Sequence, residues 1–183
     1  MSGPRVVGID LSLTSTGLAD NRGRTERVRT KPATTVPGTV RRLLDITEAV
    51  RGFADIWASL DIQDDADLVV IEGPSYGSTT GQQHTRGGLW WLVVSSLRDF
   101  PILVVPPTTR AMYATGKGNA GKDEVLTSAI RRYPAYDITG NDVADAVVLA
   151  AIGARMLGHP IDDLPKTHLR ALDKLTLPEG TTP

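Results

Sequence analysis

The chain has 183 residues, a mass of 19.6 kDa and a formal net charge of -1. Its 40% apolar and 22% charged residues are ordinary for a globular protein, and no run approaches the ~20 apolar residues of a membrane span. We therefore expect one cytoplasmic domain without a membrane segment. The absence of cysteine excludes disulfides, thiolate catalysis and zinc–thiolate sites, so oxygen ligands are the main option for a metal ion.

Two of three predicted buried strands end in an acidic residue. Residues 5–10 are an almost continuous apolar run that ends in Asp10. Residues 68–71 form a second such run, which ends at Glu72 and is stopped by a Gly-Pro pair. Residues 101–105 predict a third buried strand. An acid at the end of a buried strand is a candidate for a functional site, because ligands of α/β sheets gather at strand ends.

A polar hairpin and several helices complete the predicted fold. Residues 15–20 and 24–31 flank the turn Asn21-Arg22-Gly23, which predicts a hairpin at one edge of the sheet. The composition of 75–88 predicts a mobile surface loop. Apolar residues at helical spacing predict helices over 39–60 and over the run between Asn141 and Gly158. Residues 89–97 are apolar nearly all round and predict a helix buried against the sheet or a second subunit, and further helices are predicted over 108–115 and 122–133. We expect the apolar stripe of 39–60 to pack on the sheet, including Val40, Leu43, Leu44 and Phe53.

The last predicted helix carries two acids on its apolar face. Asn141 suits an N-cap, and Gly158 suits the position after the helix. Asp142 and Asp145 fall on one stripe. The same stripe carries Leu149, Ile152 and Met156. An unpaired carboxylate that faces a core costs several kcal/mol, so it should be neutralised, paired or metal-bound. The helix dipole by itself favours an acid at Asp142 but not at Asp145.

Two acids at strand ends and two on one helix are what a binuclear metal site requires. Mg²⁺ and Mn²⁺ prefer carboxylate oxygens, and two such ions ~4 Å apart activate a water and stabilise the leaving oxygen in phosphoryl transfer. If their strands are parallel neighbours, Asp10 and Glu72 lie side by side at one edge of the sheet. The sequence therefore predicts a site made of Asp10, Glu72, Asp142 and Asp145.

The motifs around these acids resemble a known family in order and spacing. They are Val-Val-Gly-Ile-Asp10 with Thr16-Gly17, Val-Val-Ile-Glu72, Thr-Gly-Lys-Gly-Asn-Ala-Gly-Lys122 and Asn-Asp142-Val-Ala-Asp145-Ala. Over roughly residues 5–157 the chain resembles RuvC-type Holliday-junction resolvases of the ribonuclease-H-like superfamily, in a phage or divergent form. The resemblance implies an α/β fold with a five-stranded mixed sheet flanked by helices. It also implies a homodimer and metal-dependent paired nicking of four-way DNA junctions, with the four acids as metal ligands.

DNA contacts are predicted beside the acids. Arg110, Lys117 and Lys122 precede the acidic helix, and we expect them to contact DNA phosphates. For Lys122 we favour this contact over the alternative of a solvated helix start. Tyr76 follows the second acid and could stack on an unpaired base, which is worth ~1–3 kcal/mol. We expect residues 89–97 to help form the dimer. Residues 1–158 are predicted as the nuclease domain and 159–183 as a polar extension with a disordered end.

Three rival interpretations use the same residues. Residues 116–123 nearly match a phosphate-binding P-loop, but Asp123 replaces the hydroxyl that would hold Mg²⁺. Residues 10–17 also resemble the phosphate hairpin of actin-like and sugar-kinase ATPases, which need a second similar domain. A non-catalytic junction-binding protein should have lost one or more of the acids, and none is missing.

Overall fold

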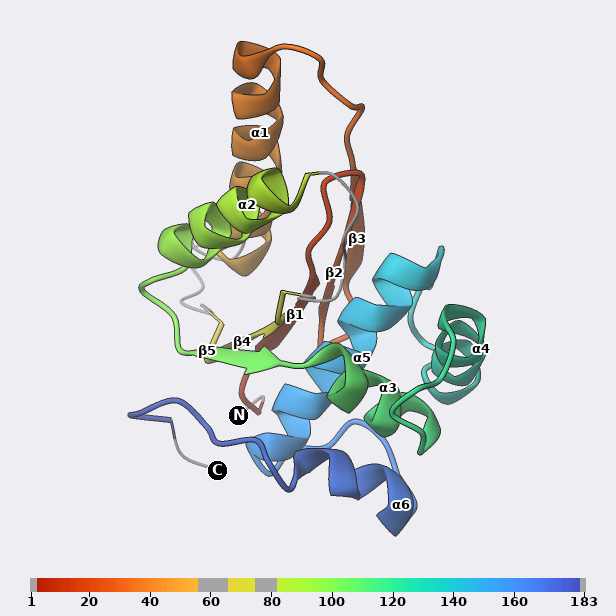
Figure 1. Cartoon of the computed structure of the whole chain (residues 1–183). Coiled ribbons are helices and arrows are strands. Elements are labelled where there is room, and N and C mark those ends of the chain that lie inside the picture. The colour runs from red at the N-terminus through yellow and green to blue at the C-terminus, as the bar shows by residue number, and fades with distance from the viewer. Residues whose placement is uncertain (1–2, 56–65, 75–81, 182–183) are drawn as a thin grey trace.

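The computed structural model describes residues 3–55, 66–74 and 82–181, which form one sheet with helices on both faces (Figure 1). No helix in these ranges is long and apolar enough to cross a membrane. The strands are β1 (Val6–Asp10), β2 (Ser15–Asp20), β3 (Thr25–Arg29), β4 (Leu68–Glu72) and β5 (Ile102–Val105). The helices are α1 (Val36–Ala54), α2 (Gln83–Ser96), α3 (Pro107–Thr115), α4 (Lys122–Arg132), α5 (Asn141–Met156) and α6 (Lys166–Leu169), followed by a 3-10 turn at Arg170–Leu172.

The sheet is mixed, with strand order β3-β2-β1-β4-β5. The predicted hairpin is confirmed, because β2 pairs antiparallel with both β1 and β3. Strand β1 pairs parallel with β4, and Ile9 lies opposite Ile71. The carboxyl ends of these two strands are therefore neighbours, as expected from their acidic ends. The predicted five-stranded mixed sheet flanked by helices is confirmed.

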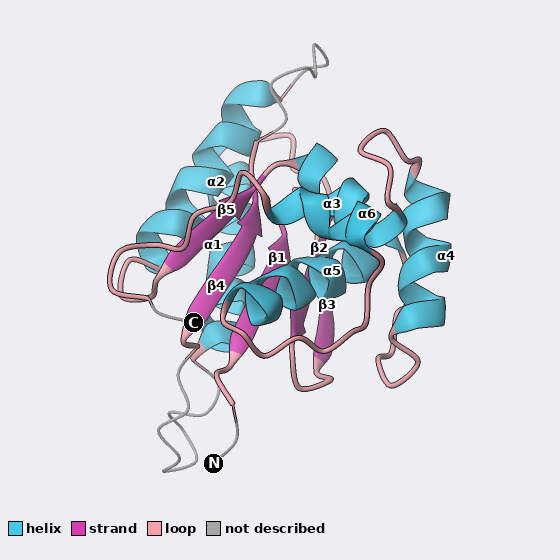
Figure 2. Ribbon diagram, turned by 90° about the horizontal axis from the view of Figure 1, so that it is seen from below, coloured by secondary structure: helices cyan, strands magenta, loops and turns pink. Residues whose placement is uncertain are grey.

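Side-chain alternation along the strands decides which way the acids point. Val7 and Ile9 belong to the core beneath α1 and α2, whereas Val6 and Val70 belong to the core that contains α5. Figure 2 shows α5 crossing one face of the sheet. Successive residues of a strand face opposite sides, so Asp10 and Glu72 continue the series of Val6 and Val70. Both acids therefore face the helix that carries the other two.

Helix α5 lies on the sheet at backbone distance. A Cβ added at Gly8 would lie 2.1 Å from the carbonyl oxygen of Ala146, and one at Gly17 would lie 2.0 Å from that of Asp142. Only glycine allows so close an approach. Every residue of α5 from Val143 to Ala154 is buried, because α3 and α4 cover its other side. The sequence predicted one apolar stripe on this helix, whereas the structure buries the helix on all sides.

Helix α1 differs from its prediction at both ends and in its packing. It begins at Val36, since Thr35 caps it and proline is tolerated in a first turn. It ends at Ala54, and the predicted part beyond 55 lies outside the described residues. The prediction that Val40 and Leu44 pack on the sheet is wrong, because they are 50% and 45% exposed. The buried face is formed instead by Arg42, Ile46, Val50, Phe53 and Ala54.

Helix α2 is longer than predicted. It begins at Gln83, so the expected loop over 75–88 is wrong for its last six residues, while 75–81 lie outside the described residues. The Gly-rich sequence gave little helical signal there, but Leu89 and Val93 dock the helix on the sheet. Trp91 is 67% exposed. The helix is thus buried on one side only.

The glycine loop and the tail also bear on the predictions. Residues 116–121 join helix α3 to helix α4, whereas a P-loop joins a strand to a helix, which excludes the P-loop reading. The predicted polar extension beyond Gly158 returns to the protein, and its Leu164 and Ala171 are buried in the α5 core. The domain boundary at 158 stays a prediction, but this segment packs with the rest.

Candidate active site

The fold brings the four predicted acids to one place. Asp10 and Glu72 end β1 and β4, and Asp142 and Asp145 occupy the first turns of α5. The pKa of Asp10 is raised well above its ordinary value, first by burial and then by the negative charges of Asp145 and Glu72. Such mutual repulsion requires close approach. The acids form a cluster of like charge at the carboxyl end of the parallel strands.

Asp145 is the most buried member of the cluster. It is 5% exposed, and burial raises its pKa to about 7. The charge of Arg110 opposes this shift, and that of Glu72 adds to it. A carboxylate so deeply buried needs a cationic partner, in agreement with the position of Asp145 one turn inside the helix.

A single arginine bridges two of the acids. The Nε of Arg110, on α3, donates to Oε2 of Glu72 at 2.6 Å, and its Nη1 donates to Oδ1 of Asp145 at 2.5 Å. Burial lowers the pKa of Arg110, but the carboxylates of Asp145 and Glu72 outweigh burial and raise it. Arg110 is 8% exposed, and in this arrangement its guanidinium faces the acids. The predicted DNA contact would require it to face an incoming phosphate instead.

A second arginine holds Asp142. Oδ2 of Asp142 accepts hydrogen bonds from Ser15 Oγ at 2.6 Å and from Nη2 of Arg27 at 2.8 Å. The Nε of Arg27, on β3, also donates to Ser15 at 2.7 Å. No motif or spacing in the sequence related Arg27 or Ser15 to the acids, so both were missed as partners of the cluster. They fix the start of α5 against the hairpin.

The donor set suits a hard divalent cation, but its present arrangement does not form a metal site. All four side chains are carboxylates, the oxygen ligands that Mg²⁺ and Mn²⁺ prefer. Among the described residues, no three His, Cys, Asp or Glu side chains are grouped so that they could hold a metal ion. The guanidinium of Arg110 takes up the facing oxygens of Glu72 and Asp145 instead. The residues fit the ion by chemistry, and Arg110 is the cation they hold here.

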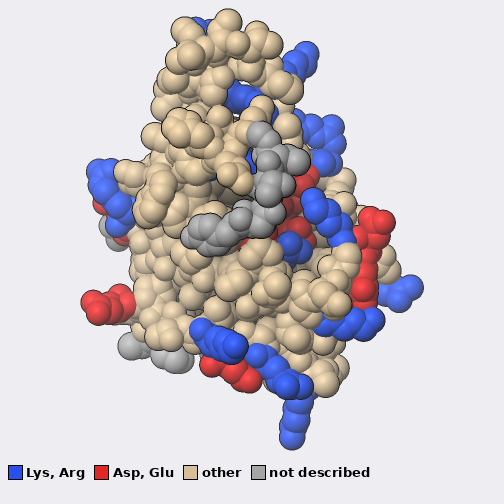
Figure 3. All heavy atoms as spheres, in the orientation of Figure 1, with Lys and Arg blue, Asp and Glu red and all other residues tan. Residues whose placement is uncertain are grey.

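A cleft of about 710 Å³ opens beside the cluster. Its lining includes Asp10, Glu72, Asp142, Lys122, Trp90 and Trp91. In Figure 3, acidic and basic atoms come together in the middle of this face, below the largely uncharged surface over α1 and α2. Lys122 is exposed at the start of α4, and its charge reaches Asp145. Lys117 is instead paired with Glu124 at 3.1 Å, and Tyr76 lies outside the described residues.

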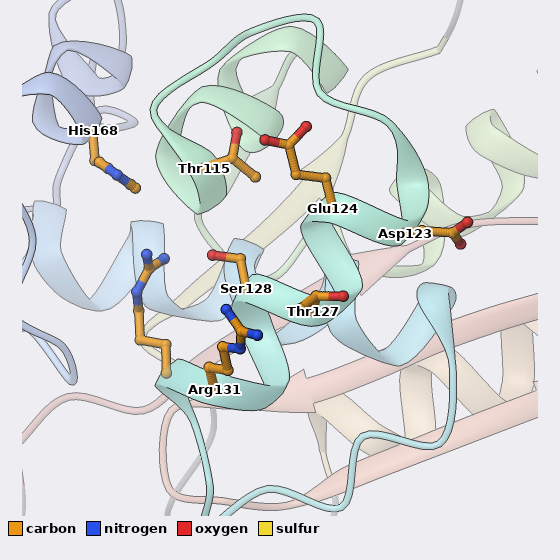
Figure 4. A pocket seen from close by; sticks show the side chains of 8 residues that line it. Thr115, Asp123, Glu124, Thr127, Ser128, Arg131 and His168 are labelled. Carbon is orange, nitrogen blue, oxygen red and sulfur yellow. The ribbon is translucent and has the colours of Figure 1, made fainter.

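A second cavity, of about 760 Å³, contains none of the four acids. It lies between α3, α4 and the C-terminal segment, and Figure 4 shows Thr115, Ser128 and His168 on its walls. Asp123 points away from the other labelled side chains in that view. The cavity is lined by both acidic and basic side chains, and they do not converge on one point. We therefore take the cleft at the acids as the candidate site.

A mixed sheet of this order, with acids at the ends of β1 and β4 and on α5, defines a ribonuclease-H-like fold. The solved structures it resembles include Thermus thermophilus RuvC, at a TM-score of 0.61 and 18% identity over 85% of this chain and 97% of that one. T. thermophilus RuvC in complex with a Holliday junction substrate matches at a TM-score of 0.59, 18% identity, 81% of this chain and 91% of that one. The chain therefore shares the fold of RuvC.

Comparison with curated protein sequences also finds RuvC proteins, over a shorter segment of the chain. The crossover junction endodeoxyribonuclease RuvC of Chlamydia trachomatis serovar L2 is 39% identical over 79 residues, which are 42% of this chain and 45% of the relative. The serovar A protein is 38% identical over the same length. The match thus spans about half of these relatives. No protein-family model matches the chain. The resemblance to RuvC seen in the sequence is confirmed.

The raised pKa of Asp145 predicts how stability changes with pH. Its value is 3.8 when unperturbed and about 7 in the fold, so the folded protein binds this proton more tightly than the unfolded chain does. The free energy of unfolding should therefore fall as pH rises through that interval. We expect the difference in this free energy between the wild type and Asp145→Asn to fall between about pH 5 and about pH 8 in EDTA, measured by urea unfolding. A difference that stays constant over this range would contradict the assigned burial.

Proposed function

We propose that this protein is a metal-dependent, structure-selective endonuclease that resolves four-way (Holliday) or other branched DNA by paired nicking. The observation that carries the proposal is the acid cluster: Asp10 and Glu72 at adjacent parallel strand ends face Asp142 and Asp145 on α5. The RuvC fold and the sequence match support the choice of substrate. A DNA substrate of this kind implies a cytoplasmic protein.

The acids are proposed to hold Mg²⁺ or Mn²⁺, two per active site. Bound there, the ions would supply Lewis-acid activation of the phosphodiester and of the attacking water. The ligands would be Asp10, Glu72, Asp142 and Asp145. Their support differs: Asp145 is buried deepest, whereas Asp142 already has Arg27 and Ser15 as partners.

The other residues of the cleft would bind and orient DNA. The exposed Lys122 offers a charge to a backbone phosphate beside the acids. The indole N–H of Trp90 donates to the backbone carbonyl of Glu72 at 3.3 Å, which ties α2 to the end of β4. The half-buried ring of Trp90 itself lines the same cleft. The cleft thus combines cation, acids and an aromatic wall, which suits a nucleic-acid strand.

Paired nicking requires two active sites, and α1 and α2 carry a surface for a second copy. Large apolar side chains are exposed on these two adjacent helices: Val36 (78%), Val40 (50%), Leu44 (45%), Trp91 (67%) and Leu92 (40%). Contiguous exposed apolar surface marks an interaction site. A closed pair of identical copies buries one such surface against the other. We therefore propose a homodimer through α2, which contains the predicted 89–97 segment, together with α1.

The dimer predicts a specific effect of a charge at Trp91. Trp91→Glu should give a monomer, because an unpaired carboxylate would be buried at the contact. Light scattering at micromolar concentration measures the mass. The matched control is Ile130→Glu, since Ile130 is 49% exposed on α4, away from this surface. It should leave the dimer intact. A wild-type monomer, or equal effects of both variants, would contradict the proposed interface.

Cleavage of a labelled four-way junction tests the function directly. The purified protein is incubated with the junction or with linear duplex of the same sequence, in Mg²⁺, Mn²⁺ or EDTA. We expect symmetrical nicks in the junction with either metal, little cutting of duplex and none in EDTA. Absence of metal-dependent cleavage on every branched substrate would refute the proposal.

One observation favours the alternative of a non-catalytic junction-binding protein. Arg110 already neutralises Glu72 and Asp145, so the cluster has an internal cation. A protein of this kind would bind the junction with the same affinity in metal and in EDTA and would cut nothing. Binding and cleavage measured on one substrate separate the two candidates.

A further inference from the structure

We propose that Arg110 is a built-in competitor of the metal: its guanidinium holds Glu72 and Asp145 in the metal-free protein and leaves them when a divalent cation binds. The inference rests on the proposed function, since it concerns the same carboxylates. The inference adds a role for Arg110, which is not one of the proposed metal ligands. Arg110 would act through the acids, as a positioning residue.

The geometry supports competition because the contacts use the facing carboxylate oxygens. Nε and Nη1 of Arg110 donate to Glu72 and Asp145 at 2.6 and 2.5 Å, within the range of strong charge-assisted hydrogen bonds. The two acids belong to different elements, β4 and α5. One guanidinium therefore sets the separation of the two acids. An ion that binds both acids would compete with Arg110 for their negative charge and for the space between them.

Burial supports the same conclusion. The side chains of Arg110, Glu72 and Asp145 are 10%, 17% and 7% exposed, so water screens them little. Without a cation, these acids would face one another and Asp10 in a poorly solvated site, at a high electrostatic cost. Arginine keeps its charge at every pH the protein meets. Deprotonation of Arg110 therefore does not release the acids, whereas a competing cation can.

Displacement would also give Arg110 a second partner. A buried guanidinium that loses its carboxylates needs another anion, and a DNA phosphate entering the adjoining cleft is one. The exchange would couple the two ligands, because metal would free Arg110 for DNA and DNA would hold it away from the acids. The predicted phosphate contact of Arg110 would then belong to the metal-bound state.

The affinity of the DNA-free protein for Mn²⁺ tests the inference. Arg110→Gln removes the competing charge and keeps a polar side chain, so Mn²⁺ should bind at least about tenfold more tightly than to the wild type, measured by calorimetry at about pH 8. Mn²⁺ should also raise the melting temperature of the variant more than that of the wild type. The matched control is Arg155→Gln, since Arg155 pairs with Asp162 far along α5 from the acids. Its Mn²⁺ affinity should equal that of the wild type.

The outcomes separate this inference from the proposed function. Equal or weaker Mn²⁺ binding by Arg110→Gln would overturn it, even if the wild type cuts junctions. Failure of every form to bind Mn²⁺ would overturn both. If Arg110→Gln does not fold by circular dichroism, Arg110→Lys replaces it. A lysine is a point charge that cannot donate to both acids as a planar fork does, so it should also bind Mn²⁺ more tightly than the wild type.

Discussion

Asp145→Asn is expected to abolish metal-dependent cleavage of a four-way junction while leaving junction binding intact. The amide removes a charge from the most buried acid of the cluster, which is 5% exposed. A neutral ligand holds Mg²⁺ poorly, and we expect the cleavage rate to fall by more than about a hundredfold. The basic residues proposed to contact DNA are unchanged. Gel-shift binding in EDTA and single-turnover cleavage in Mg²⁺ measure the two effects separately.

The matched control is Asp163→Asn, an identical change at an exposed residue of the C-terminal segment. It should leave both binding and cleavage as in the wild type. Loss of binding and cleavage together in Asp145→Asn would mean that Asp145 supports the fold, independently of any metal, through its bond with Arg110. Circular dichroism of the variant decides whether the fold has been lost.

Gly17→Ala is expected to impair both stability and cleavage. The added Cβ would lie 2.0 Å from the carbonyl oxygen of Asp142, so α5 must move away from β2 at the turn that bears the acids. Forcing a methyl group into a packed site costs about 1–3 kcal/mol. The same shift moves Asp142 relative to Asp10, so the cleavage rate should fall even at temperatures where the variant is folded. Urea unfolding and junction cleavage measure the two losses.

Gly52→Ala provides the opposite control. Gly52 lies inside α1, and nothing lies within 4 Å of an added Cβ. Alanine in a helix interior is favoured over glycine by about 0.5–1 kcal/mol, so this variant should be slightly more stable and equally active. If Gly17→Ala were as stable and active as the wild type, the close approach of α5 to the sheet would be wrong.

The place of the acids could be predicted because it follows from short-range rules. Buried strands read clearly from their apolar runs, so Asp10 and Glu72 could be assigned to strand ends before their pairing was known. Helical spacing put Asp142 and Asp145 on one face. The parallel pairing of β1 with β4 then brought these groups together. The metal-binding role of the four acids remains a proposal.

The arginine partners of the acids could not be predicted, because they depend on how distant elements pack. Arg110 precedes Asp145 by 35 residues and Arg27 precedes Asp142 by 115, and no local pattern relates them. The sequence therefore suggested a DNA contact for Arg110, which is the usual role of a basic residue near a nuclease site. The orientation of α3 against the sheet turns it inward instead.

The surface of α1 shows a second limit of periodicity. Apolar residues recur along α1 at helical spacing, and this pattern predicts one buried face. The structure buries Ile46 and Val50 and leaves Val40 and Leu44 exposed. The helix therefore carries two apolar faces, one for the sheet and one for the proposed dimer. Sequence spacing alone does not distinguish a core contact from a contact with a second copy.

The most direct test of the acid cluster is a crystal structure of the protein soaked in Mn²⁺. The ion is identified by its anomalous scattering. We predict density among Asp10, Glu72, Asp142 and Asp145, with the guanidinium of Arg110 withdrawn from Glu72 and Asp145. A saturated soak that shows no density at these carboxylates, with Arg110 still bound to both acids, would contradict the proposed metal site.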